Sequence, residues 1–97
     1  MLFRMRINIA PEGVAITKRF FLALDTLQMR RELRGMKTFT DRYGINYWNL
    51  STLKKEPERR FLKPEWLSHL VQDYGVNANW LLVGVGNMFA NSKSIEL

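Results

Sequence analysis

Residues 36–55 constrain the fold most, because a single glycine separates two short apolar patterns. Phe39 and Tyr43 stand at positions i and i+4 before Gly44, and apolar residues recur at helical spacing after it. Glycine adopts the left-handed backbone that ends a helix without a steric penalty. Asn46 then offers a side-chain oxygen that can cap the next helix. The sequence therefore predicts two short helices joined by a tight turn. A helical corner that only packs would carry the same turn.

The helix predicted over residues 46–55 has an outward face that follows from the advance of about 100° per residue. Leu50 and Leu53 mark its buried side. The opposite side carries no acid and holds Tyr47, Trp48, Ser51, Thr52 and Lys55. Hydroxyls, cations and apolar groups are what base edges in a major groove can accept. We expect these five residues to face DNA bases. The alternatives are a solvated surface or, for the tryptophan, contact with another subunit or a neighbouring loop.

Composition limits the class of protein. The chain has 97 residues, 46% of them hydrophobic, which suits one small domain with a core. It has no cysteine, so disulfides and thiolate metal sites are excluded, and we expect neither a metal nor a cofactor. No apolar run approaches the roughly 18–20 residues of a membrane span, and arginines interrupt the apolar N-terminus. We expect a cytoplasmic protein without a membrane segment.

The positive charge is concentrated in one part of the chain. The net charge is +6, and residues 30–63 hold ten lysines and arginines against four acids. A basic zone of this kind favours a polyanion through the release of counterions. Its cations could also serve only to keep the protein dispersed. The residues expected to contact DNA phosphates are Lys37, Arg42, Asn46, Lys54, Arg59 and Arg60.

The first nine residues alternate between apolar and other side chains, which predicts a strand. No partner strand is evident elsewhere. One interpretation is pairing with the same strand of a second copy in a homodimer. The other is an arm that lies on the helices or is disordered. We therefore divide the chain into an arm (1–14), a helical domain (15–89) and a polar tail (90–97).

Three further helices follow from apolar spacing and from the residues at their ends. The first is predicted from about residue 15 to residue 33, with Ile16, Phe20, Leu24 and Leu27 on one stripe and Gly35 as its stop. The next begins at Pro64 and ends at Gly75. The last is predicted over 78–83, capped by Asn77 and ended by Gly84. The fold class is thus all-α, with about five short helices.

Several side chains outside these stripes are also expected in the core. Phe61 and Leu62 are predicted to anchor the basic loop over residues 57–63, and Trp80, Leu81 and Val83 to close the core. His69, the only histidine, lies off the apolar stripe of its helix and is expected at the surface.

Two segments carry a family resemblance. The sequence FTDRYGINYWNLSTL, followed by a proline-started helix and DYGVNANWLLVGVGNMF, resembles the Cro and phage-repressor (Xre-like) helix-turn-helix family over residues 15–89. The resemblance implies a compact bundle of about five helices and sequence-specific DNA binding in transcriptional control, often as a dimer on a two-fold site. By position it implies the same five base-facing residues that the helical angles give.

We therefore expect a sequence-specific DNA-binding protein, repressor-like in its fold, that acts as a transcriptional regulator. The alternative is a helix-turn-helix protein-interaction module, antitoxin-like or adaptor-like, that binds DNA weakly and without specificity. An enzyme is not expected, because one histidine, no glycine-rich phosphate loop and no metal-ligand spacing leave no recognisable catalytic set.

Overall fold

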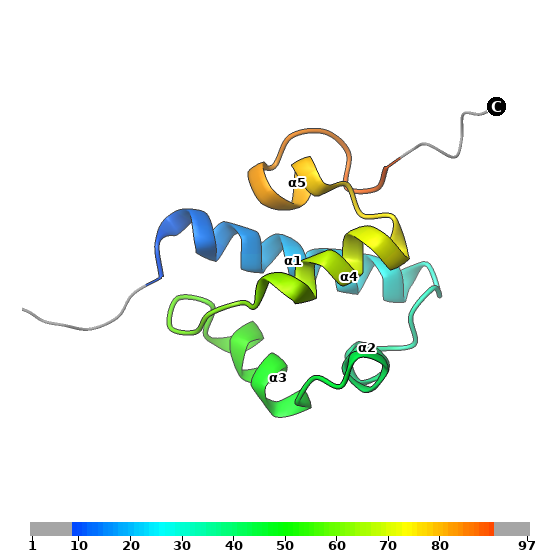
Figure 1. The fold of residues 1–97 in the computed structure, drawn as a ribbon, viewed down its shortest axis with the longest axis horizontal. Helices are drawn as coiled ribbons and strands as arrows, with labels where there is room; N and C mark the ends of the chain where they lie inside the picture. Colours follow the sequence, from blue (N-terminus) through cyan, green and yellow to red (C-terminus); the bar gives the residue numbers. More distant parts are fainter. Residues whose placement is uncertain (1–8, 91–97) are drawn as a thin grey trace, which may run out of the picture.

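The computed structural model describes residues 9–90, which contain five α-helices (Figure 1). They are α1 (Pro11–Met29), α2 (Met36–Tyr43), α3 (Tyr47–Lys55), α4 (Pro64–Tyr74) and α5 (Ala78–Val83). The predicted all-α fold is confirmed. The strand expected over residues 1–9 and the polar tail lie, apart from Ile9 and Ala90, outside the described residues. None of the helices within 9–90 has the length and apolar character needed to cross a bilayer.

Helix α1 begins and ends four residues earlier than predicted. Pro11 is its first residue, where the missing N–H is not needed, so residues 11–14 belong to the helix rather than to an arm. At the other end, Arg31 takes a left-handed backbone with φ of 63°. The N–H of Arg31 donates to the Gln28 carbonyl at 3.0 Å, and that of Glu32 to the Leu27 carbonyl at 2.9 Å. These two hydrogen bonds close the helix before Gly35, the residue that the sequence predicted as its stop.

The turn between α2 and α3 forms as predicted. Gly44 has a left-handed backbone with φ of 67°, and Ile45 N–H returns to the Thr40 carbonyl at 2.9 Å. The Asn46 side chain then accepts a hydrogen bond from Asn49 N–H at 3.0 Å, which satisfies one of the free donors at the start of α3.

Helices α4 and α5 also have the predicted ends. Pro64 opens α4, the Asn77 side chain caps α5, and Gly75 and Gly84 close the two helices in the left-handed conformation. The chain after α5 folds back, because Asn77 N–H donates to the Met88 carbonyl at 2.8 Å. This return places residues 85–90 along the connection between α4 and α5.

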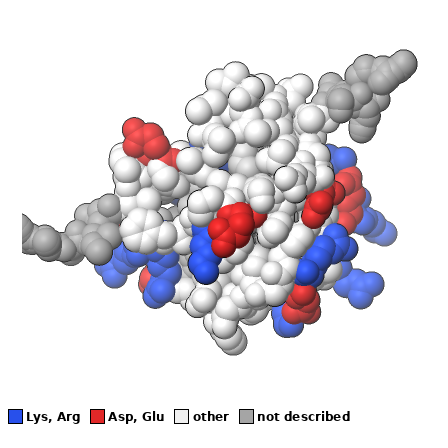
Figure 2. Space-filling view, viewed as in Figure 1, with Lys and Arg blue, Asp and Glu red and all other residues white. Residues whose placement is uncertain are grey.

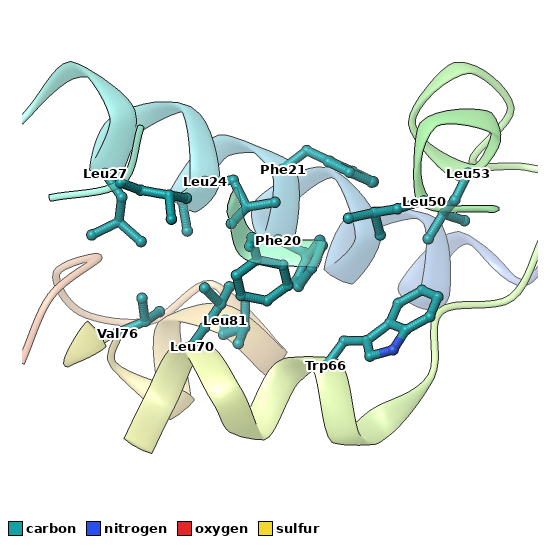
Figure 3. Packing of buried hydrophobic residues seen from close by; sticks show 13 residues of the cluster. Phe20, Phe21, Leu24, Leu27, Leu50, Leu53, Trp66, Leu70, Val76 and Leu81 are labelled. Carbon is teal, nitrogen blue, oxygen red and sulfur yellow. The ribbon is translucent and has the colours of Figure 1, made fainter. Parts of the chain in front are cut away.

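All five helices contribute to one core (Figure 3). Its buried members are Phe20, Phe21, Ala23, Leu24 and Leu27 from α1, Phe39 from α2, Leu50 and Leu53 from α3, Trp66 and Leu70 from α4, and Leu81 from α5, together with Leu33 and Val76. Each large side chain buried in this way contributes on the order of 1.5–3 kcal/mol. On α1, Thr17 is buried and Ile16 only half-buried, so the apolar stripe is rotated slightly from the predicted one.

Two residues predicted to face the core point to solvent instead. Phe61 is 69% exposed, because Leu62 takes the inward position and neighbouring side chains of an extended segment point to opposite sides. Val83 is 65% exposed. It lies about 200° around α5 from Leu81, which is buried against the core. Both predictions are therefore wrong.

Candidate nucleic-acid interface

The orientation of α3 is set by its buried side. Leu50 and Leu53 are almost fully buried, and Figure 3 shows both directed into the same cluster as Trp66 of α4. The Asn46 cap fixes where the helix begins. Helix α3 packs against α1 and α2, so its remaining side is turned away from the bundle.

All five residues predicted to face bases lie on α3, and none is sealed beneath another element. Trp48 is 71% exposed and Lys55 is exposed, while Tyr47, Ser51 and Thr52 are half-buried. The Tyr47 and Trp48 rings meet edge to face with centroids 5.8 Å apart. No residue of α3 is acidic. The surface is thus aromatic, hydroxylic and basic.

The Thr52 hydroxyl is partly committed within the helix. It donates to the Trp48 carbonyl at 2.7 Å, so in this rotamer its free lone pairs can only accept. Its methyl group is available for apolar contact. The position suits a base-edge amino group or a thymine methyl.

Three of the cations predicted to contact phosphates are paired with acids. Lys37 Nζ lies 2.9 Å from Asp41 Oδ1, Lys54 Nζ lies 3.6 Å from Asp25 Oδ1, and Arg60 Nε lies 3.4 Å from Glu56 Oε1. All six side chains are well exposed, and such pairs contribute about 0–1 kcal/mol. Figure 2 shows lysines and arginines interleaved with acids on the face that it presents. A phosphate could replace these acids at little cost.

The remaining predicted phosphate residues are arranged differently. The Arg42 guanidinium donates to the Tyr74 hydroxyl at 2.7 Å, and Asn46 is engaged as the cap of α3 through its oxygen, which leaves its amide N–H groups available. Arg59 has no ion pair with an acid among residues 9–90. Lys54 lies on the α1 side of α3, near the Phe21 ring, and therefore stands apart from the base-facing set.

Sequence reasoning missed one group of candidate contacts and left a second group undecided. Asn49 and Lys63 join Arg59 and Arg60 around a hollow beside α3. The helical angles place Asn49 at the edge of the outward face, which could have signalled it. The second group is Arg31 and Arg34, which the sequence alone allows either as phosphate contacts or as part of a solvated face. They join Arg42 around a hollow between the end of α1 and α2. Only the folded chain brings these three arginines together.

The end of α2 is fixed to α4 by an aromatic and hydrogen-bonded contact. The Tyr43 hydroxyl donates to Asp73 Oδ2 at 2.5 Å, and its ring stacks on His69. Burial raises the pKa of the Tyr43 hydroxyl, and its hydrogen bond to Asp73 raises it further. His69 is therefore half-buried in this contact and is not the free surface residue that the sequence predicted.

No group of three or more His, Asp or Glu side chains within residues 9–90 could hold a metal ion. Comparison with family models, with curated proteins and with solved structures finds no match for this chain. The resemblance to the Cro and phage-repressor family stays a prediction.

Proposed function

We propose that this protein binds DNA in a sequence-specific manner and regulates transcription by placing α3 in the major groove. The observation that carries the proposal is the open side of α3, where exposed Trp48 and Lys55 flank Ser51 and Thr52 and no acid is present. A major groove admits one helix and offers partners for each of these side chains.

The surroundings of α3 support the proposal through charge. Arg59, Arg60 and Lys63 line the hollow that borders Asn49 of α3. Contacts of this kind hold a protein on the DNA backbone and fix its register, whereas the α3 side chains would supply the sequence preference. If about six phosphates are contacted, the logarithm of the association constant should fall with the logarithm of salt concentration with a slope near −5.

We infer further that two copies associate through one uncharged surface, which we call the α5 face. It consists of exposed Leu82, Val83 and Val85 beside an apolar groove lined by Pro64, Leu67, Val71, Ala78 and Leu81. Residues 75–90 contain no charged side chain, and Figure 2 shows an uncharged surface over α5. Two proteins of charge +6 approach most easily through such a surface. A ridge and a groove on one face also suit a two-fold contact.

The test is selection of bound duplexes from a random pool at two salt concentrations, followed by binding of the selected duplex. A specific DNA-binding protein enriches a motif. Trp48→Ala and Thr52→Ala then weaken binding to the motif, each by about 1–3 kcal/mol, and leave binding to random DNA unchanged. Arg59→Ala combined with Arg60→Ala weakens all duplexes alike and flattens the salt slope. A pool without enrichment would overturn the proposal.

One observation favours the alternative of a protein-interaction module. The edge-to-face pair of half-buried Tyr47 and exposed Trp48 is the kind of aromatic surface enriched in protein interfaces. On that alternative the random pool yields no motif, and Trp48→Ala has no effect on the weak binding to DNA.

A further inference from the structure

Three arginines line the hollow between the end of α1 and α2. Its lining includes Arg31 and Arg34 from the connection and Arg42 from the last turn of α2, together with Gln28 and Thr38. Arginine guanidinium groups, with a hydroxyl and an amide, form the set of donors that suits a phosphate group.

Glu32, the one acid that lines this hollow, already has a partner outside it. Its carboxylate lies 2.6 Å from the Arg30 guanidinium. Within the described range 9–90, none of the three arginines of the hollow has an acid within ion-pair distance. Their positive charges are thus not neutralised by an ion pair with an acid, which favours the binding of an anion.

Arg31 stands where the backbone favours glycine. Three other helices end at a residue in the left-handed conformation, and in each case that residue is glycine: Gly44, Gly75 and Gly84. Helix α1 ends in the same conformation with an arginine, whose φ is 63°. A side chain in this region is disfavoured by contact of its Cβ with the backbone. Strain of this kind is often found at functional sites.

Arg42 is held in place by a contact with α4. Its Nη1 donates to the Tyr74 hydroxyl at 2.7 Å, and the guanidinium carbon lies 5.7 Å from the centre of the Tyr74 ring. A guanidinium fixed in this way loses less conformational entropy when it binds an anion. Arg30 is directed elsewhere, over the Phe89 ring at 4.2 Å.

We propose that this hollow binds a phosphate group through Arg31, Arg34 and Arg42. The phosphate can belong to a DNA backbone or to a free nucleotide, because the same donors recognise both. Where it belongs to DNA, the inference rests on the proposed function and adds a backbone contact at the α2 side of the interface.

The experiment is a two-dimensional ¹H–¹⁵N NMR titration of the whole protein with inorganic phosphate at constant ionic strength. We expect saturable shifts concentrated at the amides of Arg31, Arg34, Thr38 and Arg42. Arg31→Gly should raise the melting temperature, because glycine adopts this left-handed backbone without a steric penalty. The same substitution should weaken phosphate binding several-fold. Adding Arg34→Gln should bring the loss to about tenfold or more, as expected when two charge-assisted contacts are removed. Lys18→Gln removes one exposed charge from α1 as a matched control, and it should change neither the melting temperature nor the affinity for phosphate.

Two results would overturn the inference: shifts spread evenly over all basic residues, or wild-type phosphate affinity in the Arg31→Gly, Arg34→Gln double variant. Parallel titrations with adenosine monophosphate and with a duplex identify the source of the phosphate. A duplex that shifts α3 but not the hollow contradicts this site and leaves the proposed function standing. If phosphate shifts the amides of the hollow but a duplex does not shift α3, the phosphate site is supported and the proposed function is contradicted.

Discussion

The imidazole of His69 lies parallel to the ring of Tyr43, with the two centroids 3.8 Å apart and an angle of 5° between the planes. Tyr43 is the last residue of α2, and His69 lies in the middle of α4. The Tyr43 hydroxyl also donates to Asp73, one turn further along α4. The end of α2, directly before the turn at Gly44, is therefore fixed to α4.

Loss of the stacked ring should destabilise the fold. We expect His69→Ala to lower the free energy of unfolding by about 0.5–1.5 kcal/mol, the contribution typical of a packed aromatic pair. His69→Phe, which keeps a flat ring at the same position, should retain most of it. Urea unfolding followed by circular dichroism measures both variants. An alanine variant as stable as the wild type would show that the stack does not hold α2 to α4.

The raised pKa of Tyr43 has a consequence at alkaline pH. Its phenol ionises less readily in the folded protein than in the unfolded chain, where tyrosine has a pKa of about 10. The stabilisation linked to this group is therefore fully present below pH ~10 and is lost as the pH rises toward its folded pKa. Tyr43→Phe should remove the part of the loss in unfolding free energy at alkaline pH that comes from this group.

The difference in unfolding free energy between the wild type and Tyr43→Phe, measured from pH 7 to 11, checks this prediction. The difference should be constant up to pH ~10 and change only above it. Absorbance of the tyrosinate gives an independent measure, since the variant should lack the component with the raised pKa. A difference that already varies between pH 7 and 9 would contradict the assignment.

The Asn46 cap links stability to the proposed DNA contact, and two substitutions separate these roles. Asn46→Ala should cost about 1 kcal/mol of stability, because Asn49 N–H loses its acceptor. Asn46→Asp keeps the acceptor and places a negative charge at the favourable end of α3, so stability should be retained. It also replaces the amide donors with a charge that repels phosphate.

Chemical denaturation and titration with the selected duplex, carried out on both variants, test this separation. We expect weak DNA binding by the aspartate variant despite its normal stability. Normal binding by that variant would remove Asn46 from the phosphate contacts.

The helix ends that could be predicted are those marked by local backbone chemistry. Gly44 and Asn46 specify a turn within three residues, and Pro64 and Gly75 bound α4 in the same way. The end of α1 escaped prediction because Arg31 adopts a conformation that its residue type disfavours. Without a glycine at this position, no local feature of the sequence marks the end of α1.

The outward face of α3 was also predictable, since it follows from helical geometry once Leu50 is placed in the core. The electrostatic partners were not. Lys54 pairs with Asp25 from α1, and Arg42 donates to Tyr74 from α4. These partners are far apart in the sequence, and only the packing of the helices brings them together. The same limit applies to the three arginines of the hollow, which come from two segments.

The α5 face gives the last prediction, which concerns assembly. Arg19 of α1 donates to the carbonyls of Leu81 and Leu82 at 2.9 and 3.0 Å, so the end of α5 is fixed and its exposed side chains are held outward. Val83→Lys combined with Val85→Lys places two charges there without touching the core. We expect the wild type to sediment as a dimer and the double variant as a folded monomer. On a duplex with two half-sites the variant should bind more weakly, whereas its binding to one half-site stays unchanged. Met29→Lys, at another exposed apolar position, is the control and should leave the dimer intact. A wild-type protein that remains monomeric at high concentration, or a double variant that still dimerises, would exclude this surface as the contact between copies.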